Sequence, residues 1–77
     1  MSSGDNRRMA IYGEILRIEP ALGFGFIRDD HQGDWFFVAA GVREGIDGLW
    51  VGERVAFSQE WTSNGPRATD IHHEFSE

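Results

Sequence analysis

Cysteine and lysine are both absent from this chain of 77 residues. Without cysteine there is no disulfide and no cysteine-ligated zinc site, and thiol catalysis is excluded. A chain without disulfides fits a reducing compartment, and we expect a cytoplasmic protein. No apolar run approaches the roughly 18 residues of a membrane-spanning helix, and Arg7 and Arg8 precede no apolar stretch of signal-peptide length. We therefore expect a soluble protein with no membrane partner.

Positive charge is scarce as well. Seven arginines stand against thirteen acidic residues, which gives a net charge of −6 at pH 7. Such a balance repels phosphate at long range and slows the encounter with a polyanion. It does not exclude nucleic-acid binding, because stacking on aromatic rings is a local interaction and a small basic patch can exist on an acidic protein.

Sequence signals for catalysis and for metal binding are missing. There is no GxxxxGK phosphate-binding motif. His72 and His73 are neighbours, and adjacent side chains of a strand point to opposite faces, so the two rings cannot chelate one ion together. We expect no enzymatic activity, no catalytic residue, no metal site and no cofactor.

Two aromatic segments organise the chain, Gly23-Phe24-Gly25-Phe26-Ile27 and Asp34-Trp35-Phe36-Phe37-Val38. The polar residues 28–33 between them, with a glycine near the end, predict a hairpin connection. Side chains alternate between the two faces of a strand. One face of the hairpin is therefore predicted to carry Phe24, Phe26 and Phe36, and the other Ile27, Trp35 and Phe37.

A hairpin that is apolar on both sides is either buried on both or exposes an aromatic platform. Unpaired bases stack on such rings for about 1–3 kcal/mol each, with little regard to sequence. Simple core packing is the alternative role for the three phenylalanines. Gly23 and Gly25 favour the platform, because glycine inside a strand indicates a close approach to the backbone. Furthermore, the opposite face of the hairpin already supplies core residues.

The rest of the chain predicts three more strands, over residues 10–19, 51–61 and 67–73. Residues 40–49 are expected to form a loop with one helical turn at 42–45, and residues 62–65 a polar turn. Residues 1–9 are predicted to be a flexible segment and 74–77 a tail, around a single domain over 10–73. The predicted core contains Ile15, Ile27, Trp35, Phe37, Val55, Phe57, Ala68 and Ile71.

The two aromatic motifs together resemble those of the cold-shock domain family. Further motifs follow in the family's order: Gly13-x-Ile15, Leu49-x-x-Gly52-x-x-Val55-x-Phe57 and Gly65-Pro66-x-Ala68-x-x-Ile71. The resemblance runs from about Ala10 to His72. It implies an all-β fold, a five-stranded antiparallel barrel of the OB type. It also implies a cold-shock-like protein that binds single-stranded RNA or DNA as an RNA chaperone or expression regulator.

Several positions depart from the family's pattern on the ligand face. Arg17 and Ile18 stand where the family usually has tryptophan and phenylalanine, and Leu16 stands where lysine is common. The usual His-Phe pair is replaced by Val38-Ala39. Arg17 can still stack its planar guanidinium on a base. The nucleic-acid-binding residues that we predict are Arg17, Phe24, Phe26, Phe36, Val38 and Arg67.

A second hypothesis is that the same face binds a protein. An exposed apolar patch with few charges is typical of a protein interface. The lost aromatic, histidine and lysine positions favour this hypothesis, whereas the three retained phenylalanines favour nucleic acid. The predicted face for a protein partner comprises Leu16, Ile18, Phe24, Phe26, Val38 and Ile46. In either case we expect a monomer.

Overall fold

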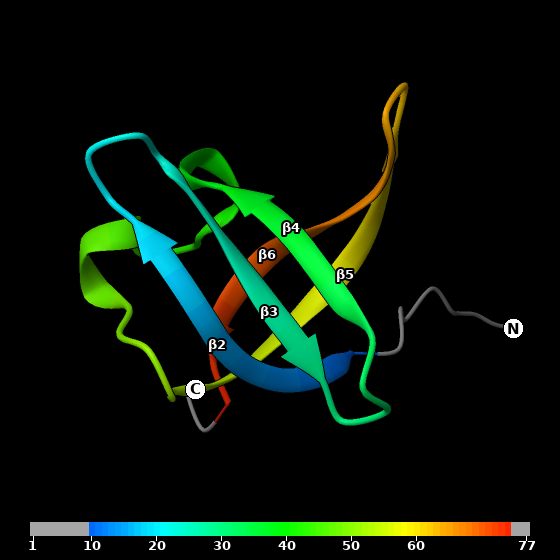
Figure 1. Cartoon of the computed structure of the whole chain (residues 1–77), viewed down its shortest axis with the longest axis horizontal. Helices are drawn as coiled ribbons and strands as arrows, with labels where there is room; N and C mark the ends of the chain where they lie inside the picture. The colour runs from blue at the N-terminus through cyan, green and yellow to red at the C-terminus, as the bar shows by residue number, and fades with distance from the viewer. Residues whose placement is uncertain (1–9, 75–77) are drawn as a thin grey trace, which may run out of the picture.

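The computed structural model describes residues 10–74, which form one sheet of five antiparallel strands in the order β4-β3-β2-β5-β6 (Figure 1). The strands are β2 (Ile11–Glu19), β3 (Phe24–Asp29), β4 (Asp34–Val38), β5 (Arg54–Thr62) and β6 (Gly65–His73). The predicted all-β antiparallel class is confirmed. The predicted flexible segment 1–9 and residues 75–77 of the predicted tail lie outside the described residues.

The sheet curls, but it is not a barrel closed by hydrogen bonds. Its two edge strands, β4 and β6, pack against each other, and no ladder within residues 10–74 joins them. Val42 instead pairs with Ile71 of β6 through an isolated parallel bridge. The N–H of Arg43 donates to the carbonyl of Ile71 at 2.8 Å. The segment that follows β4 therefore takes up part of the gap between the edges.

The helical turn predicted over residues 42–45 is wrong. The 3-10 turns lie on either side of it, at Ala39–Gly41 (η1) and Ile46–Gly48 (η2). Val42 itself is extended, with φ −101° and ψ 120°, because it is drawn into the bridge with β6. Neither turn has the length or the apolar character of a membrane-crossing helix, and no other helix occurs in residues 10–74.

The core between the curled faces of the sheet contains seven of the eight predicted residues. Those buried as predicted are Ile15, Ile27, Phe37, Val55, Phe57, Ala68 and Ile71. Three further hydrophobic side chains are buried that the sequence did not predict, namely Val42, Ile46 and Ala56. Val42 and Ile46 come from the loop after β4, so that loop closes one end of the core.

Trp35 is the exception, since it is half-buried rather than buried. Its ring packs against the core, with its centroid 5.3 Å from that of Phe57. Its indole N–H donates to the carboxylate of Asp29 at 2.7 Å. A buried indole N–H needs a polar partner. This requirement keeps one edge of the ring at the surface, beside the β3–β4 turn.

Asp29 organises that turn. Its side chain also accepts hydrogen bonds from the N–H groups of His31 and Gly33, both at 2.8 Å. The bond from Trp35, and next that from Gly33, lowers the pKa of Asp29 below its ordinary value of 3.8. Hydrogen bonds to a charged acceptor stabilise it more than bonds to a neutral one. The ionised carboxylate therefore holds the turn together.

We expect Asp29→Asn to lower the free energy of unfolding at neutral pH by about 1 kcal/mol, since one acceptor oxygen becomes a donor facing the Trp35 indole. The folded pKa is depressed, so the carboxylate contributes fully above the unfolded value of about 3.8 and loses its contribution as pH falls through the folded pKa. Chemical denaturation across this range measures it. An undiminished difference between the variant and the parent well below pH 3.8 would contradict the assignment.

Glycine is required at the two positions of the first aromatic motif, Gly23 and Gly25, for different physical reasons. A Cβ on Gly25 would lie 2.5 Å from Cζ of Phe37 and 2.5 Å from the carbonyl oxygen of Arg17. The close approach predicted at Gly25 therefore exists, but it is made by the core. Gly23 has φ +78°, a conformation that glycine adopts readily, and it lies in the turn from β2 to β3. Neither glycine by itself indicates a ligand.

Candidate nucleic-acid interface

The strand register places the three predicted phenylalanines on one face of the sheet. Phe26 of β3 is directly opposite Phe36 of β4, and Phe24 is directly opposite Val38. Directly opposed residues of antiparallel strands have their side chains on the same face. We call Phe24, Phe26 and Phe36 the aromatic platform. The adjoining positions of β3 and β4, Gly25, Ile27 and Phe37, are buried on the core face.

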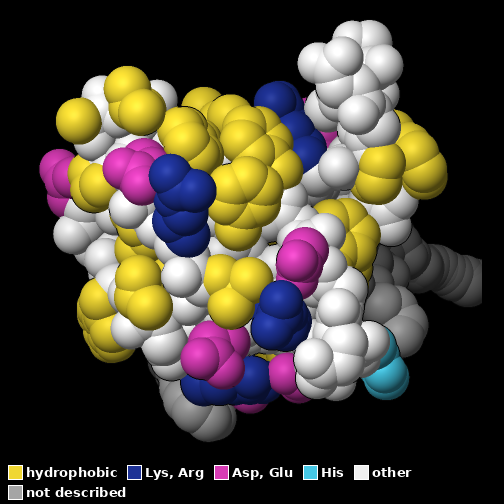
Figure 2. All heavy atoms as spheres, viewed as in Figure 1, with side chains coloured by type: hydrophobic (Ala, Val, Ile, Leu, Met, Phe, Trp, Pro, Cys, Tyr) yellow, Lys and Arg dark blue, Asp and Glu magenta, His cyan; other side chains and the backbone are white. Residues whose placement is uncertain are grey.

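The rings of the platform form one continuous surface. The centroids of Phe24 and Phe36 are 5.9 Å apart with the planes 30° from parallel. Phe26 meets Phe24 at 6.1 Å and Phe36 at 5.7 Å, in edge-to-face arrangements. Phe36 is 39% exposed, whereas the other two are half-buried against their neighbours. Figure 2 shows the hydrophobic patch on this side of the molecule, with basic side chains beside it.

Arg17 reaches the platform through a bulge in β2. The register shifts between Ile15 and Arg17, so that Leu16 and Arg17 together stand opposite Phe26. The guanidinium carbon of Arg17 lies 5.9 Å from the centroid of the Phe24 ring. Its Nε donates to the carboxylate of Glu19 at 2.9 Å. Arg17 therefore extends the flat surface of the platform, with one of its donors already occupied.

Val38 and Arg67 both line a hollow beside the platform. Ala40, Gly41, Glu60, Ala68 and Thr69 also line this hollow. Arg67 is directly opposite Glu60 in the β5–β6 hairpin, and its Nε donates to that carboxylate at 3.1 Å. The structure thus brings all six predicted binding residues to one region, the outer face of β2, β3 and β4 and the hollow beside it.

Arg28 is a further cation of this face that the prediction did not include. It is directly opposite Glu14 of β2 and Asp34 of β4, two positions along β3 from Phe26. Its Nε donates to Asp34 at 3.0 Å. The alternation of side chains along β3 places Arg28 on the platform's face, but the hairpin connection predicted from the sequence, residues 28–33, included Arg28. In the structure β3 continues to Asp29.

Two residues of the predicted protein-binding face belong to the core side instead. The bulge puts Ile18 opposite Gly25, and Ile18 packs against the core. Ile46, in η2, is 8% exposed and is part of the core. The prediction that these two belong to an exposed apolar face is wrong. Leu16, Phe24, Phe26 and Val38 remain, each half-buried, with Phe36 beside them.

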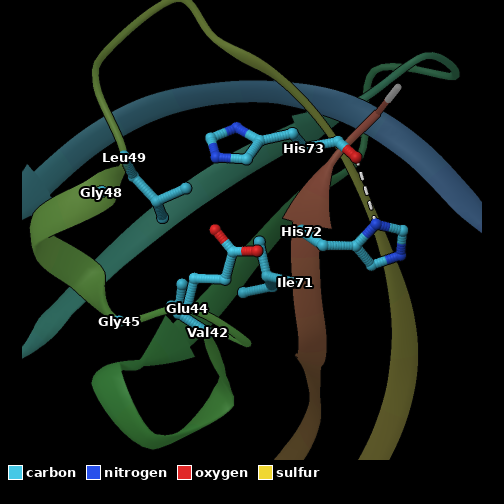
Figure 3. Close-up of a pocket in the computed structure, with 8 residues that line it drawn as sticks. All are labelled: Val42, Glu44, Gly45, Gly48, Leu49, Ile71, His72 and His73. Carbon is cyan, nitrogen blue, oxygen red and sulfur yellow. Dashed lines mark hydrogen bonds between the residues drawn. The ribbon is translucent and has the colours of Figure 1, made fainter. Parts of the chain in front are cut away.

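The two histidines at the end of β6 project away from each other (Figure 3). Nδ1 of His72 lies 3.1 Å from the carbonyl oxygen of His73. The His73 ring bonds through Nδ1 to the buried carboxylate of Glu53, and it packs against Trp50 with the centroids 5.7 Å apart. Within residues 10–74 no three potential metal ligands come together. The bond between Glu53 and His73 joins the start of β5 to the end of β6.

The geometry of the platform suits stacking rather than chemistry on a substrate. Flat rings at the surface can receive unpaired bases, and the planar guanidinium of Arg17 can take a base or a phosphate.

No protein-family model matches the chain. Over 61 residues it is 36% identical to the cold shock-like protein CspA of Vibrio cholerae. The matched region covers 77% of this chain and 87% of that protein. Identity of this extent shows that the chain belongs to the cold-shock protein family.

Proposed function

We propose that this chain binds single-stranded RNA or DNA by stacking bases on the aromatic platform, with little dependence on sequence. The observation that carries the proposal is the continuous surface of three rings, 5.7–6.1 Å apart, on the outer face of the sheet. Membership of the cold-shock family supports it. The cellular role that we infer is that of a cytoplasmic RNA chaperone or expression regulator, acting as a monomer through an OB-type domain over residues 10–73.

Binding is expected to be weak for such a face. The family's usual aromatic positions are taken by Arg17 and Ile18 in β2 and by Val38 and Ala39 at the end of the second motif. Each lost ring removes on the order of 1–3 kcal/mol of stacking. The cations near the rings are few, and the overall charge is −6. Most of the affinity must therefore come from the rings themselves.

The test is a titration of a short fluorescent oligothymidylate and its oligouridylate counterpart at low salt, read by anisotropy. None of the three tryptophans is in the platform, so intrinsic fluorescence is the poorer signal. We expect saturable binding with a log–log salt slope of about −2 or shallower, since two or three phosphate contacts each contribute about −0.7. The absence of saturable binding by folded protein would contradict the proposal. A slope steeper than about −4 would indicate a basic surface elsewhere.

A protein partner remains the second candidate, and one observation favours it. The arginines at the platform are each paired with a carboxylate, and the partly exposed side chains between them, Phe24, Phe26, Phe36 and Val38, are apolar. Apolar surface with neutralised charges is typical of protein interfaces. This candidate predicts weak oligonucleotide binding or none, together with broadening or shifting of the NMR signals of Phe24, Phe26 and Phe36 when the partner is added.

A further inference from the structure

Every arginine that the structure describes has a carboxylate partner. The pairs are Arg17–Glu19 at 2.9 Å, Arg28–Asp34 at 3.0 Å, Arg43–Asp70 at 3.1 Å, Arg54–Asp30 at 2.8 Å, Arg54–Glu74 at 2.9 Å and Arg67–Glu60 at 3.1 Å. For Arg54 and Arg43 these bonds raise the arginine pKa, and the Arg54 bond lowers the pKa of Asp30. Each arginine charge within residues 10–74 is therefore already paired with a carboxylate of the same chain.

Two of these pairs lie where a nucleic-acid strand would cross the platform. Glu19 is directly opposite Phe24 and pairs with Arg17, whose guanidinium lies over the Phe24 ring. Glu60 is directly opposite Arg67 and lines the same hollow as Val38. Both carboxylates are on the same side as the groups that would receive bases. Exposed ion pairs of this kind contribute little to folding, so stability does not explain their position.

We propose that Glu19 and Glu60 determine the specificity of the platform by competing with phosphate for Arg17 and Arg67. This inference rests on the proposed function. Each carboxylate occupies a guanidinium donor and places a negative charge beside the path of the strand. A phosphate must displace that carboxylate and approach against its charge, whereas a base can still stack on the rings and on the guanidinium plane. The platform thus selects unpaired bases and rejects polyanions that offer only phosphate.

The test is the double variant Glu19→Gln/Glu60→Gln, which keeps the shape of both side chains and removes their charge. The probes are a fluorescent oligothymidylate and an abasic oligonucleotide of the same length, which has the phosphates without the bases. We expect the variant to bind both probes about tenfold more tightly or better. Two additional phosphate contacts should steepen the log–log salt slope by about 1.4. The preference for bases over the abasic chain should fall.

The matched control is Glu44→Gln/Asp47→Asn, which changes the net charge by the same amount. Both residues lie in the segment between β4 and β5, and neither belongs to the platform or to its hollow. A general charge effect would raise affinity equally in both double variants, and this outcome would overturn the inference. Circular dichroism and thermal unfolding establish that each variant is folded.

The outcomes separate this inference from the proposed function. If parent and variants bind the oligothymidylate equally well with equal salt slopes, the competition by Glu19 and Glu60 is refuted while the stacking function stands. If no folded variant binds either probe, both fail. If only Glu19→Gln/Glu60→Gln binds, the parent does not stack bases, and both its stacking function and its selection of bases over phosphate are refuted.

Discussion

Replacing Phe26 with alanine is expected to weaken oligonucleotide binding by about tenfold or more, which corresponds to roughly 1.4 kcal/mol. Phe26 meets both other rings of the platform edge-to-face, with its centroid 6.1 Å from that of Phe24 and 5.7 Å from that of Phe36. Its removal takes away one stacking surface and leaves its two neighbours without an edge contact. Since the side chain is half-buried on the outer face, no cavity forms inside the core. The free energy of unfolding should fall by no more than about 1.5 kcal/mol.

The matched control is Phe37→Ala, which removes the same ring one strand away. Phe37 is fully buried between the curled faces of the sheet. A buried phenylalanine replaced by alanine costs about 3–5 kcal/mol of stability, because a cavity remains. Anisotropy titration and chemical denaturation of both variants measure the two effects. A loss of 3 kcal/mol or more in Phe26→Ala would return Phe26 to the core and remove both binding hypotheses for this face.

Gly25→Ala is expected to lower the free energy of unfolding by about 3 kcal/mol, at the upper end for overpacked cores, or to prevent folding. The new methyl group would lie 2.5 Å from Cζ of Phe37 and 2.5 Å from the backbone oxygen of Arg17. Real Cβ atoms do not approach other heavy atoms so closely. The Phe37 ring cannot yield easily in a packed core, and the Arg17 backbone is fixed by the bulge in β2.

Gly48→Ala is the matched control for that substitution. A Cβ on Gly48 meets nothing within 4 Å, and its φ lies outside the left-handed region. Its stability should stay within about 0.5 kcal/mol of the parent. Adding Phe37→Leu to Gly25→Ala should restore only part of the loss, since the clash with Arg17 remains. Equal stabilities for Gly25→Ala and Gly48→Ala in urea denaturation would refute the role assigned to Gly25.

Local sequence pattern alone predicts which side chains share a face of the β3–β4 hairpin. The alternation of Phe24, Gly25, Phe26 and Ile27 has a period of two, and that period survives in any regular strand. It placed three phenylalanines on one side and Phe37 with Ile27 on the other, as the register confirms. The strand class and most of the core followed from the same local pattern, because burial of one face selects the apolar parity.

The features that break the alternation or join distant segments depend on the complete fold. The bulge in β2 turns the side chain of Arg17 to the platform face and that of Ile18 to the core face. A sequence pattern of period two cannot show this change of face. Val42 and Ile46 became core residues because the loop after β4 folds back against Ile71. The pairing of arginines with carboxylates also joins residues far apart in the sequence, such as Arg54 with Asp30 and Arg43 with Asp70. Composition gives the number of charges, but their neutralisation depends on distances that the fold alone sets.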